Sequence, residues 1–372
     1  MTATPVPSQG LTSPLFASGA LAFFLLGILP ALFGVALPVW SDAFGLAEGQ
    51  GGTLVALYNA GAAIAVLAGV AGVPGLSMRP ASAVVALGAA GLALGAAWSL
   101  LLASALLAGL GFGVLAVAIN RRFLQEFGAR GPGMVAFVNG IYGLGAILAP
   151  LLFLAVGGRA GPVLWATAAL AALAMALSRP EPFRNATPGL PPLSPRLLIL
   201  LFTFGSVVIE AALIGLGASA LVDLGLSEPS AARLVSAFFA AFVAARLGLA
   251  LVTHRLPPDL VFLGGLLGTT ACLLGAALVS PAWGFVPAGA FIGICFPAFF
   301  VWSSRLLGPD PRLGAAILAA GLVGGTLGPL ALRPILGAFG EESLFWILSV
   351  FGALLTAVVG AFLPRLRRLP RP

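Results

Sequence analysis

Twelve apolar segments, each about 17 to 25 residues long, run through this chain, and nearly all of its charged side chains lie between them. A segment of this length can cross the hydrocarbon core of a bilayer as an α-helix. Because lipid offers no hydrogen bonds, such a segment must pair its own backbone groups, and a helix does so. The expected spans are 16–40, 51–72, 81–97, 100–120, 133–156, 161–178, 197–222, 229–252, 259–279, 283–304, 313–336 and 343–363.

Connections that are rich in arginine alternate along the chain with connections that hold almost none. Fourteen of the 18 arginines lie on even-numbered connections or in the C-terminal tail, whereas the odd-numbered connections hold Arg159 alone, together with six acids. Positively charged loops stay in the cytoplasm, so we expect an integral protein of a bacterial inner membrane with both termini in the cytoplasm. The 14 arginines are Arg79, Arg121, Arg122, Arg130, Arg179, Arg184, Arg196, Arg255, Arg305, Arg312, Arg365, Arg367, Arg368 and Arg371, and the six acids are Asp42, Glu48, Asp223, Glu228, Glu341 and Glu342.

Composition excludes several other classes of protein. A mean hydropathy of +1.13 and 60% hydrophobic residues leave too little polar surface for a soluble globule. The net charge of +7 therefore belongs to loops, and we expect no nucleic-acid partner. The first 14 residues contain no Lys or Arg, so the basic region of a cleavable signal peptide is missing, and the first segment is expected to remain as a helix.

A proline-rich stretch divides the chain into two halves. Residues 179–196 contain six prolines, which is typical of a semi-rigid spacer, so we expect bundles at 1–178 and 197–372 with a cytoplasmic linker between them. The halves also repeat each other in the same order, at an offset of about 180. We therefore predict an all-α membrane protein with two parallel-repeat six-helix bundles around a central cavity. The echoes pair Gly34, Asp42, 45–48 and 54–55 with Gly215, Asp223, 225–228 and 234–235, and 145–150 with 324–329.

Several glycine-rich and charged stretches extend over most of the chain. They are 27–38 followed by Phe44-Gly45-Leu46; 109–113 leading to Asn120; 139–146 ending at Pro150; Glu210; Ala245-Arg246; and Gly324-Gly325 with Pro329. In these stretches the chain resembles the major facilitator superfamily, and within it the branch of fucose and glucose permeases. The resemblance implies uptake of a sugar or similar polar solute and a place for Glu210 in the central cavity.

Two departures from that family limit what the resemblance implies. The connection 69–79 lacks the Asp-Arg-x-Gly-Arg core that many members carry, so the usual cytoplasmic gating salt bridges are not implied there. The first span lacks the acid that similar sugar permeases often use. Proton coupling, if present, must therefore rest on another residue.

Glu210 is the deepest of the charged residues that lie inside spans, about 13 residues or roughly 20 Å into the seventh span. An ionised side chain at that depth is costly, so it usually faces a water-filled cavity or a partner. We predict that Glu210 carries a proton and contacts the solute. The alternative is a structural glutamic acid that pins neighbouring helices through hydrogen bonds.

The three arginines inside spans lie closer to the span ends than Glu210 does. Arg246 approaches the cytoplasmic end of the eighth span, where a long side chain can snorkel or cap a helix, so a gating or topological role is expected. Arg333 lies near the outer end of the eleventh span, where we expect a gating salt bridge. Arg233 lies close to the outer surface and is expected to pair with an acid. Asp42 and Asp223, which occupy repeated positions at the outer ends of the first and seventh spans, complete the predicted gating set.

Neutral polar side chains complete the predicted solute site. A buried amide or phenol needs a hydrogen-bond partner, which is either a neighbouring helix or a solute hydroxyl. Asn139 and Tyr142, three residues apart on one helical face, make the best pair. Tyr58 could instead be an interfacial anchor. The other candidates are Asn59, Asn120 and Trp302.

These features favour a secondary active transporter. An intramembrane enzyme would need a nucleophile with a base, or a metal cluster, and the spans provide neither, so we expect no enzymatic activity, no cofactor and no metal. The expected partners are a small-molecule solute, protons and membrane lipids, and the chain is expected to act as a monomer. The alternatives are proton-driven efflux of amphipathic compounds, which the sparse polar side chains and the many phenylalanines favour, and a non-transporting receptor or assembly protein.

Overall fold

A computed structural model describes residues 10–47, 50–179, 199–308 and 312–368 of the 372-residue chain. The side chains of Glu228, Pro229, Arg333 and Glu341 lie outside the described part. The predicted linker 179–196 also lies outside it, except for its first residue.

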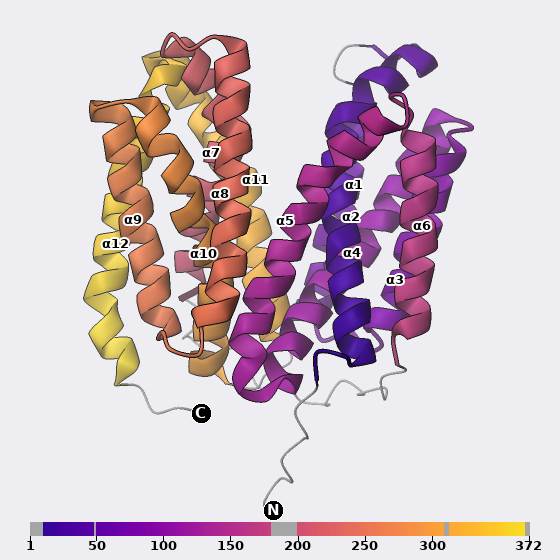
Figure 1. Cartoon of the computed structure of the whole chain (residues 1–372), viewed down its shortest axis with the longest axis horizontal. Coiled ribbons are helices and arrows are strands. Elements are labelled where there is room, and N and C mark those ends of the chain that lie inside the picture. Colours follow the sequence, from indigo (N-terminus) through magenta and orange to yellow (C-terminus); the bar gives the residue numbers. More distant parts are fainter. Residues whose placement is uncertain (1–9, 48–49, 180–198, 309–311, 369–372) are drawn as a thin grey trace, which may run out of the picture. The chain divides into compact units, whose positions relative to one another are not determined.

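Within the described ranges the chain forms α-helices and short 3₁₀ helices and no strand, which confirms the predicted all-α fold (Figure 1). Eleven helices are long and apolar enough to cross a membrane, and α3, with 17 residues, is the shorter twelfth. The elements are α1 (Pro14–Phe44), α2 (Gly52–Val70), α3 (Met78–Leu94), α4 (Trp98–Glu126), η1 (Gly128–Arg130), α5 (Gly131–Ala155), α6 (Ala160–Leu177), α7 (Leu200–Asp223), α8 (Glu228–Val252), α9 (Pro258–Leu278), α10 (Pro281–Leu307), α11 (Leu313–Phe339), η3 (Glu341–Ser343) and α12 (Leu344–Arg367).

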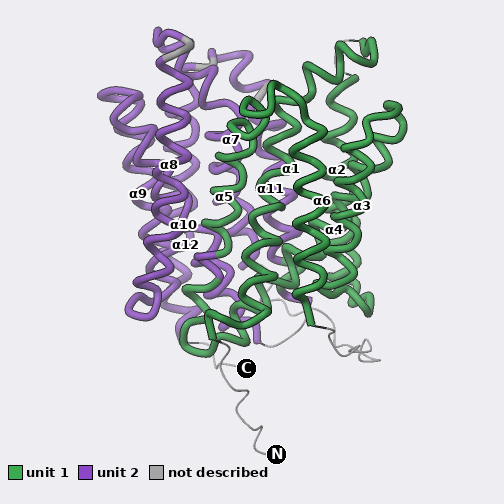
Figure 2. Tube along the Cα trace, turned by 45° about the vertical axis from the view of Figure 1, so that its right-hand side comes forward, with its two compact units in different colours: residues 1–134, 138–191, 314–316 green, residues 135–137, 192–313, 317–372 purple. Residues whose placement is uncertain are grey.

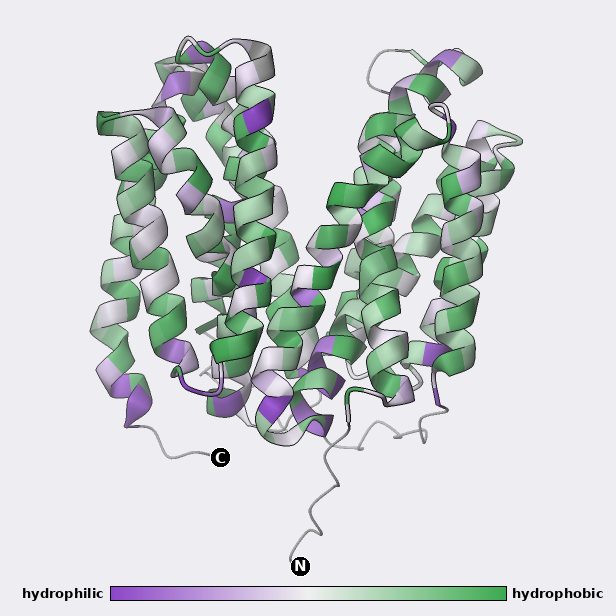
Figure 3. Cartoon of the chain, in the orientation of Figure 1, coloured by the Kyte–Doolittle hydropathy of each residue, from purple (hydrophilic) through white to green (hydrophobic). Residues whose placement is uncertain are grey.

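The helix ends differ from the predicted spans where polar residues continue a helix or glycine stops one. Helix α4 runs six residues past the predicted end at 120, because Arg122 and Glu126, one turn apart, form an ion pair on the extra turns. Helix α3 ends three residues early, because Gly95 adopts a left-handed conformation with φ of 58°. In Figure 3 the hydrophobic residues cover most of each helix, as lipid contact requires.

The chain forms two compact units, coloured green and purple in Figure 2. One comprises residues 1–134, 138–191 and 314–316, and the other comprises 135–137, 192–313 and 317–372. We call the helices α1 to α6 the N-terminal bundle and α7 to α12 the C-terminal bundle.

The N-terminal bundle is held together by close approach of its helices. Helix α4 packs against α2 and α3, and α6 packs against α1 and α3. Glycine makes this possible, because a Cβ on Gly109 would overlap the carbonyl oxygen of Tyr58, and one on Gly113 would crowd that of Ala62. Small residues at such spacing let membrane helices approach closely.

The C-terminal bundle repeats this packing. Helix α10 packs against α8 and α9, and α12 packs against α7 and α9. A Cβ on Gly289 or Gly293 would crowd the carbonyl oxygens of Phe238 and Phe242. These four residues stand 180 positions after Gly109, Gly113, Tyr58 and Ala62, so the sequence repeat corresponds to a repeated helix contact.

Candidate functional site

An ion pair joins α7 to α8 inside the C-terminal bundle. Arg246 Nη2 lies 3.4 Å from Glu210 Oε1, and the two side chains are 6% and 18% exposed. The arginine is therefore enclosed, while the carboxylate retains some access. Two opposite charges removed from water stabilise each other only when they remain together.

Contacts with α10 and with a phenylalanine of its own helix also hold the guanidinium of Arg246. Its Nε donates a hydrogen bond of 2.7 Å to the carbonyl oxygen of Gly293 on α10. Its Cζ lies 4.0 Å from the ring centroid of Phe242, one turn earlier on α8, which is a cation–π contact. Arg246 therefore connects α7, α8 and α10, with Glu210 as its acidic partner.

The position of Glu210 agrees with the predicted depth. It lies ten residues after the start of α7 at Leu200 and 13 before its end at Asp223, or roughly 15 and 20 Å at the rise of an α-helix. It is therefore near the middle of the helix.

Arg246 does not snorkel toward the helix end or cap it, and its gating role stays a prediction. Its Cα lies six residues before the end of α8, near that end as predicted, but its side chain is buried and reaches Glu210. The reason is that Cα–Cβ bonds tilt toward the start of their own helix. Helices α7 and α8 are consecutive and run in opposite directions (Figure 1). This tilt therefore brings the two side chains toward each other.

A neutral amide pair joins α4 to α5 in the N-terminal bundle. Asn139 Nδ2 donates to Asn120 Oδ1 at 2.9 Å, and Asn120 Nδ2 donates to the carbonyl oxygen of Ala116 at 2.9 Å. Both asparagines are buried. Of the two predicted uses of these amides, the structure shows the interhelical hydrogen bond.

Tyr58 lies inside an aromatic cluster of the N-terminal bundle rather than at an interface. It is 2% exposed, and its ring centroid lies 5.3 Å from that of Phe33 and 5.6 Å from that of Phe112. Phe112 in turn lies 6.5 Å from Tyr142. The buried hydroxyl of Tyr58 has no hydrogen-bond partner among the described residues, and burying such a group has a cost. A water molecule or a solute hydroxyl that reached this group would remove that cost.

The remaining predicted residues do not join either cluster. Asn59 is exposed on α2. Trp302 is buried among Phe202, Phe262 and Phe299, with its ring stacked on that of Phe202 at 6.2 Å, so its ring faces are occupied by packing. Asp42 and Asp223 are exposed near the ends of α1 and α7, and the side chain of Arg333 lies outside the described residues.

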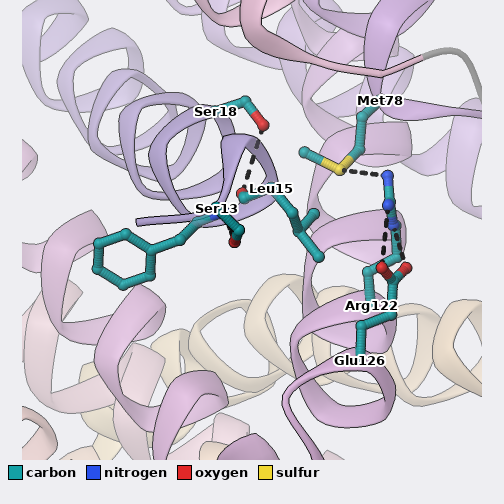
Figure 4. A network of polar contacts seen from close by, with 7 residues as sticks. Ser13, Leu15, Ser18, Met78, Arg122 and Glu126 are labelled. Atoms are coloured by element: carbon teal, nitrogen blue, oxygen red, sulfur yellow. Dashed lines mark hydrogen bonds and ion pairs between the residues drawn. The ribbon is translucent and has the colours of Figure 1, made fainter. Parts of the chain in front are cut away.

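Two ion pairs at bundle ends were not predicted. Figure 4 shows Arg122 on α4, whose Nε lies 2.6 Å from Glu126 Oε1 and whose Nη1 donates to the Met78 sulfur at 3.5 Å. In the C-terminal bundle Arg367 Nε lies 2.5 Å from Asp259 Oδ2, joining α12 to α9. The four-residue spacing of Arg122 and Glu126 indicates the first pair, whereas no local spacing indicates the second.

Comparison with known proteins identifies the fold. No family model matches the sequence, and no curated protein sequence matches it. Solved structures do match. The fucose:proton symporter FucP of E. coli superposes with a TM-score of 0.75 at 19% identity, over 95% of this chain and 98% of that one.

Two other transporters have the same fold. The proton:xylose symporter XylE matches with a TM-score of 0.72 at 14% identity, over 94% of this chain and 95% of that one. The human organic anion transporter MFSD10 matches with a TM-score of 0.68 at 16% identity, over 93% and 98%. The chain therefore has the major facilitator superfamily fold, as its resemblance to that family predicted.

Proposed function

We propose that this chain, with its major facilitator fold, is a secondary active transporter for a small organic solute and that Glu210 couples transport to protons. The observation that carries the proposal is the Glu210–Arg246 ion pair, placed near the middle of α7 and enclosed on the arginine side. Ionisable residues at such depth usually mark an ion or substrate pathway.

The geometry supports a switch in which protonation separates the pair. A proton on Glu210 removes its negative charge and with it the Coulombic attraction to Arg246. Loss of that attraction is unfavourable where the arginine is removed from water. Gain or loss of the proton therefore favours different arrangements of α7, α8 and α10, which is what alternating access between two states requires.

Comparison within the chain argues against a purely structural role for the pair. The residues 180 positions before Glu210 and Arg246 are Pro30 and Val66, on α1 and α2. The N-terminal bundle has the same order of helix packing without a charge at either place. The fold therefore does not require an ion pair here. The distance of 3.4 Å between Arg246 and the partly exposed carboxylate of Glu210 is also compatible with an ion pair that separates during transport.

For the solute we propose polar groups of the N-terminal bundle, chiefly the Tyr58 hydroxyl with Tyr142 and Asn59. The hydroxyl has no partner in the described part of the chain, and Asn59 is exposed. Asn120 uses both ends of its amide within the bundle. A sugar-like solute fits hydroxyl, amide and aromatic groups, and two proteins of the same fold are named as fucose and xylose symporters.

The alternative of drug-like efflux loses part of its support. It rested on the sparse polar side chains and on six phenylalanines of the C-terminal half. Of these, Phe238, Phe242, Phe299 and Phe300 are buried within the C-terminal bundle, whereas Phe239 and Phe296 are partly exposed. Aromatic rings that fill a helix core are not free to bind an amphipathic compound.

The test begins with a search for the solute on purified protein. Thermal stabilisation is measured across sugars, organic acids, amino acids and lipophilic cations, and the stabilising compound is then followed into proteoliposomes under an imposed pH gradient. We expect Glu210→Gln to abolish uphill transport while the protein still exchanges solute at equal concentrations. Uphill transport by Glu210→Gln with normal pH dependence would overturn proton coupling through this residue.

A matched control separates coupling from loss of fold. Ser219→Ala removes another polar group from α7, one that bonds its own helix through the Leu216 carbonyl, and it is expected to transport like the wild type. Stabilisation by lipophilic cations alone, with no sugar effect, would contradict a sugar-like solute and favour efflux.

A further inference from the structure

An apolar groove lies on the C-terminal bundle among helices α8, α9 and α10. Its volume is about 520 Å³, and its walls are almost entirely apolar, formed by residues that include Leu249, Val252, Leu256, Leu260, Gly264 and Ile294. Leu256 and Leu260 are both 45% exposed. A long hydrocarbon chain that lies in the groove would thus contact three helices rather than one.

Two neighbouring glycines of α9 have different roles at this groove. A Cβ on Gly265 would crowd the Cys295 sulfur and the Phe291 carbonyl oxygen, so this glycine lets α9 pack against α10. A Cβ on Gly264 would meet no described atom within 4 Å. The absence of a side chain at Gly264 therefore keeps space open in the groove and does not serve a close helix contact.

Two nitrogen-bearing side chains stand at one end of the groove. The groove residues Val252 and Leu256 flank the connection that carries His254 and Arg255, both exposed. Arg255 Nε donates a hydrogen bond of 3.0 Å to His254 Nε2, which orients the guanidinium and leaves its terminal nitrogens for another acceptor. Figure 3 shows this connection in purple below the ends of α8 and α9.

The surrounding charges favour an anion at this position. The nearest acid in the sequence, Asp259, is already paired with Arg367 of α12. Arg365 and Arg368 are also exposed at the end of α12. Among the described residues near the start of α9, cationic side chains therefore outnumber acidic ones, and the charge of Asp259 is already balanced by Arg367.

From these features we infer that the groove binds an anionic phospholipid, with an acyl chain along α8, α9 and α10 and the phosphate on Arg255 and His254. A guanidinium binds phosphate oxygens with paired N–H donors. Basic residues beside membrane helices recognise anionic head groups. The groove lies next to these cationic side chains, so the site favours a lipid over a free phosphate ion. Only a lipid can place an acyl chain in the groove and a phosphate on the cations.

The experiment uses the full chain, purified and delipidated in detergent, with phosphatidylglycerol and phosphatidylcholine of the same acyl chains as probes. Bound lipid is counted by native mass spectrometry, and the melting temperature is followed during titration. We expect phosphatidylglycerol to bind at least tenfold more tightly than phosphatidylcholine and to raise the melting temperature further. High salt should reduce the difference, because it screens the head-group contact.

Variants assign the effect to the groove. Gly264→Phe fills it and should remove the preference for phosphatidylglycerol, whereas Gly275→Phe, at an open position farther along α9, should retain the preference. Arg255→Gln with His254→Gln should weaken phosphatidylglycerol severalfold and leave phosphatidylcholine unchanged. Arg159→Gln, at an exposed arginine of the N-terminal bundle, controls for loss of one positive charge.

Three outcomes would overturn the proposal. They are equal binding of the two lipids, a retained preference in a folded Gly264→Phe protein, and the same stabilisation by inorganic phosphate alone. None of these measurements uses transport, so failure of the lipid site is distinguishable from failure of the proposed function.

Discussion

The two bundles share their packing and differ in their polar contacts. Glycine on α4 meets the backbone of α2 in one bundle, and glycine on α10 meets α8 in the other, at positions 180 residues apart. The buried polar contacts do not repeat. The N-terminal bundle has a neutral pair, Asn120 with Asn139, and the C-terminal bundle has the charged pair Glu210 with Arg246.

Helix contacts that occur in both bundles belong to the shared fold, whereas polar contacts that occur in one bundle are particular to that bundle. Helix α1 approaches α5 through Gly27, where a Cβ would overlap the Tyr142 carbonyl oxygen. Another close contact of these two helices does repeat: a Cβ on Gly145 of α5 would overlap the Phe24 carbonyl oxygen of α1, and one on Gly324 of α11 would crowd the Phe204 carbonyl oxygen of α7. The close approach is thus present in both bundles. The ion pair has no such counterpart, which is why we assign it to function.

The largest effect is expected from breaking the ion pair. Glu210→Ala leaves the enclosed charge of Arg246 without this counterion, which costs about 3 kcal/mol of unfolding free energy, the lower end for a buried pair because the carboxylate is partly exposed. The measurement is SDS-titrated unfolding in mixed micelles. The double variant Glu210→Ala with Arg246→Ala should recover much of the lost unfolding free energy. The C-terminal bundle would then no longer contain this buried ion pair. A double variant as unstable as the single one would contradict this.

The next effect should be equal in both bundles. Gly109→Leu and Gly289→Leu each force a side chain against the carbonyl oxygen of a facing helix, and overpacking of this kind typically costs about 1–3 kcal/mol. Melting temperatures of the two variants should fall by similar amounts. If only one variant is destabilised, the repeated glycine contacts do not have the same role.

A smaller effect is expected from the neutral pair. Asn139→Ala removes the hydrogen bond to Asn120, and interhelical hydrogen bonds in membranes contribute about 0.6 kcal/mol on average and up to about 1.7. A double-mutant cycle with Asn120→Ala measures this coupling directly. We expect it to be smaller than the coupling of Glu210 with Arg246, and the reverse order would remove the proposed difference between the bundles.

The smallest effect on stability is expected at Tyr58. Phe238 occupies the repeated position in the C-terminal bundle, so Tyr58→Phe makes the two bundles alike there. Loss of an unpartnered buried hydroxyl should leave the melting temperature unchanged or slightly raised. Affinity for the solute should nevertheless fall, read as a higher KM in proteoliposomes. Unchanged KM would remove Tyr58 from the proposed solute site.

Much of the fold and part of the candidate site could be predicted from sequence. The twelve helices followed from apolar length and alternating arginines, and the depth of Glu210 followed from its place in α7. The partner of Arg246 did not follow. Nearness to a helix end suggested snorkelling, but the direction of a side chain along its helix decides which way it reaches. The surroundings of Trp302 did not follow either, because its packing against Phe202 and Phe262 joins residues far apart in the chain.

The sequence by itself determined the number, order and approximate limits of the helices and the repeat between the halves. These properties are local, since each span must satisfy its own backbone hydrogen bonds and cover itself with apolar side chains. Only the tertiary structure decided which polar groups meet. It joined Glu210 to Arg246 across 36 positions and Asn120 to Asn139 across 19, because such contacts depend on the rotation and direction of each packed helix, which apolar length does not specify.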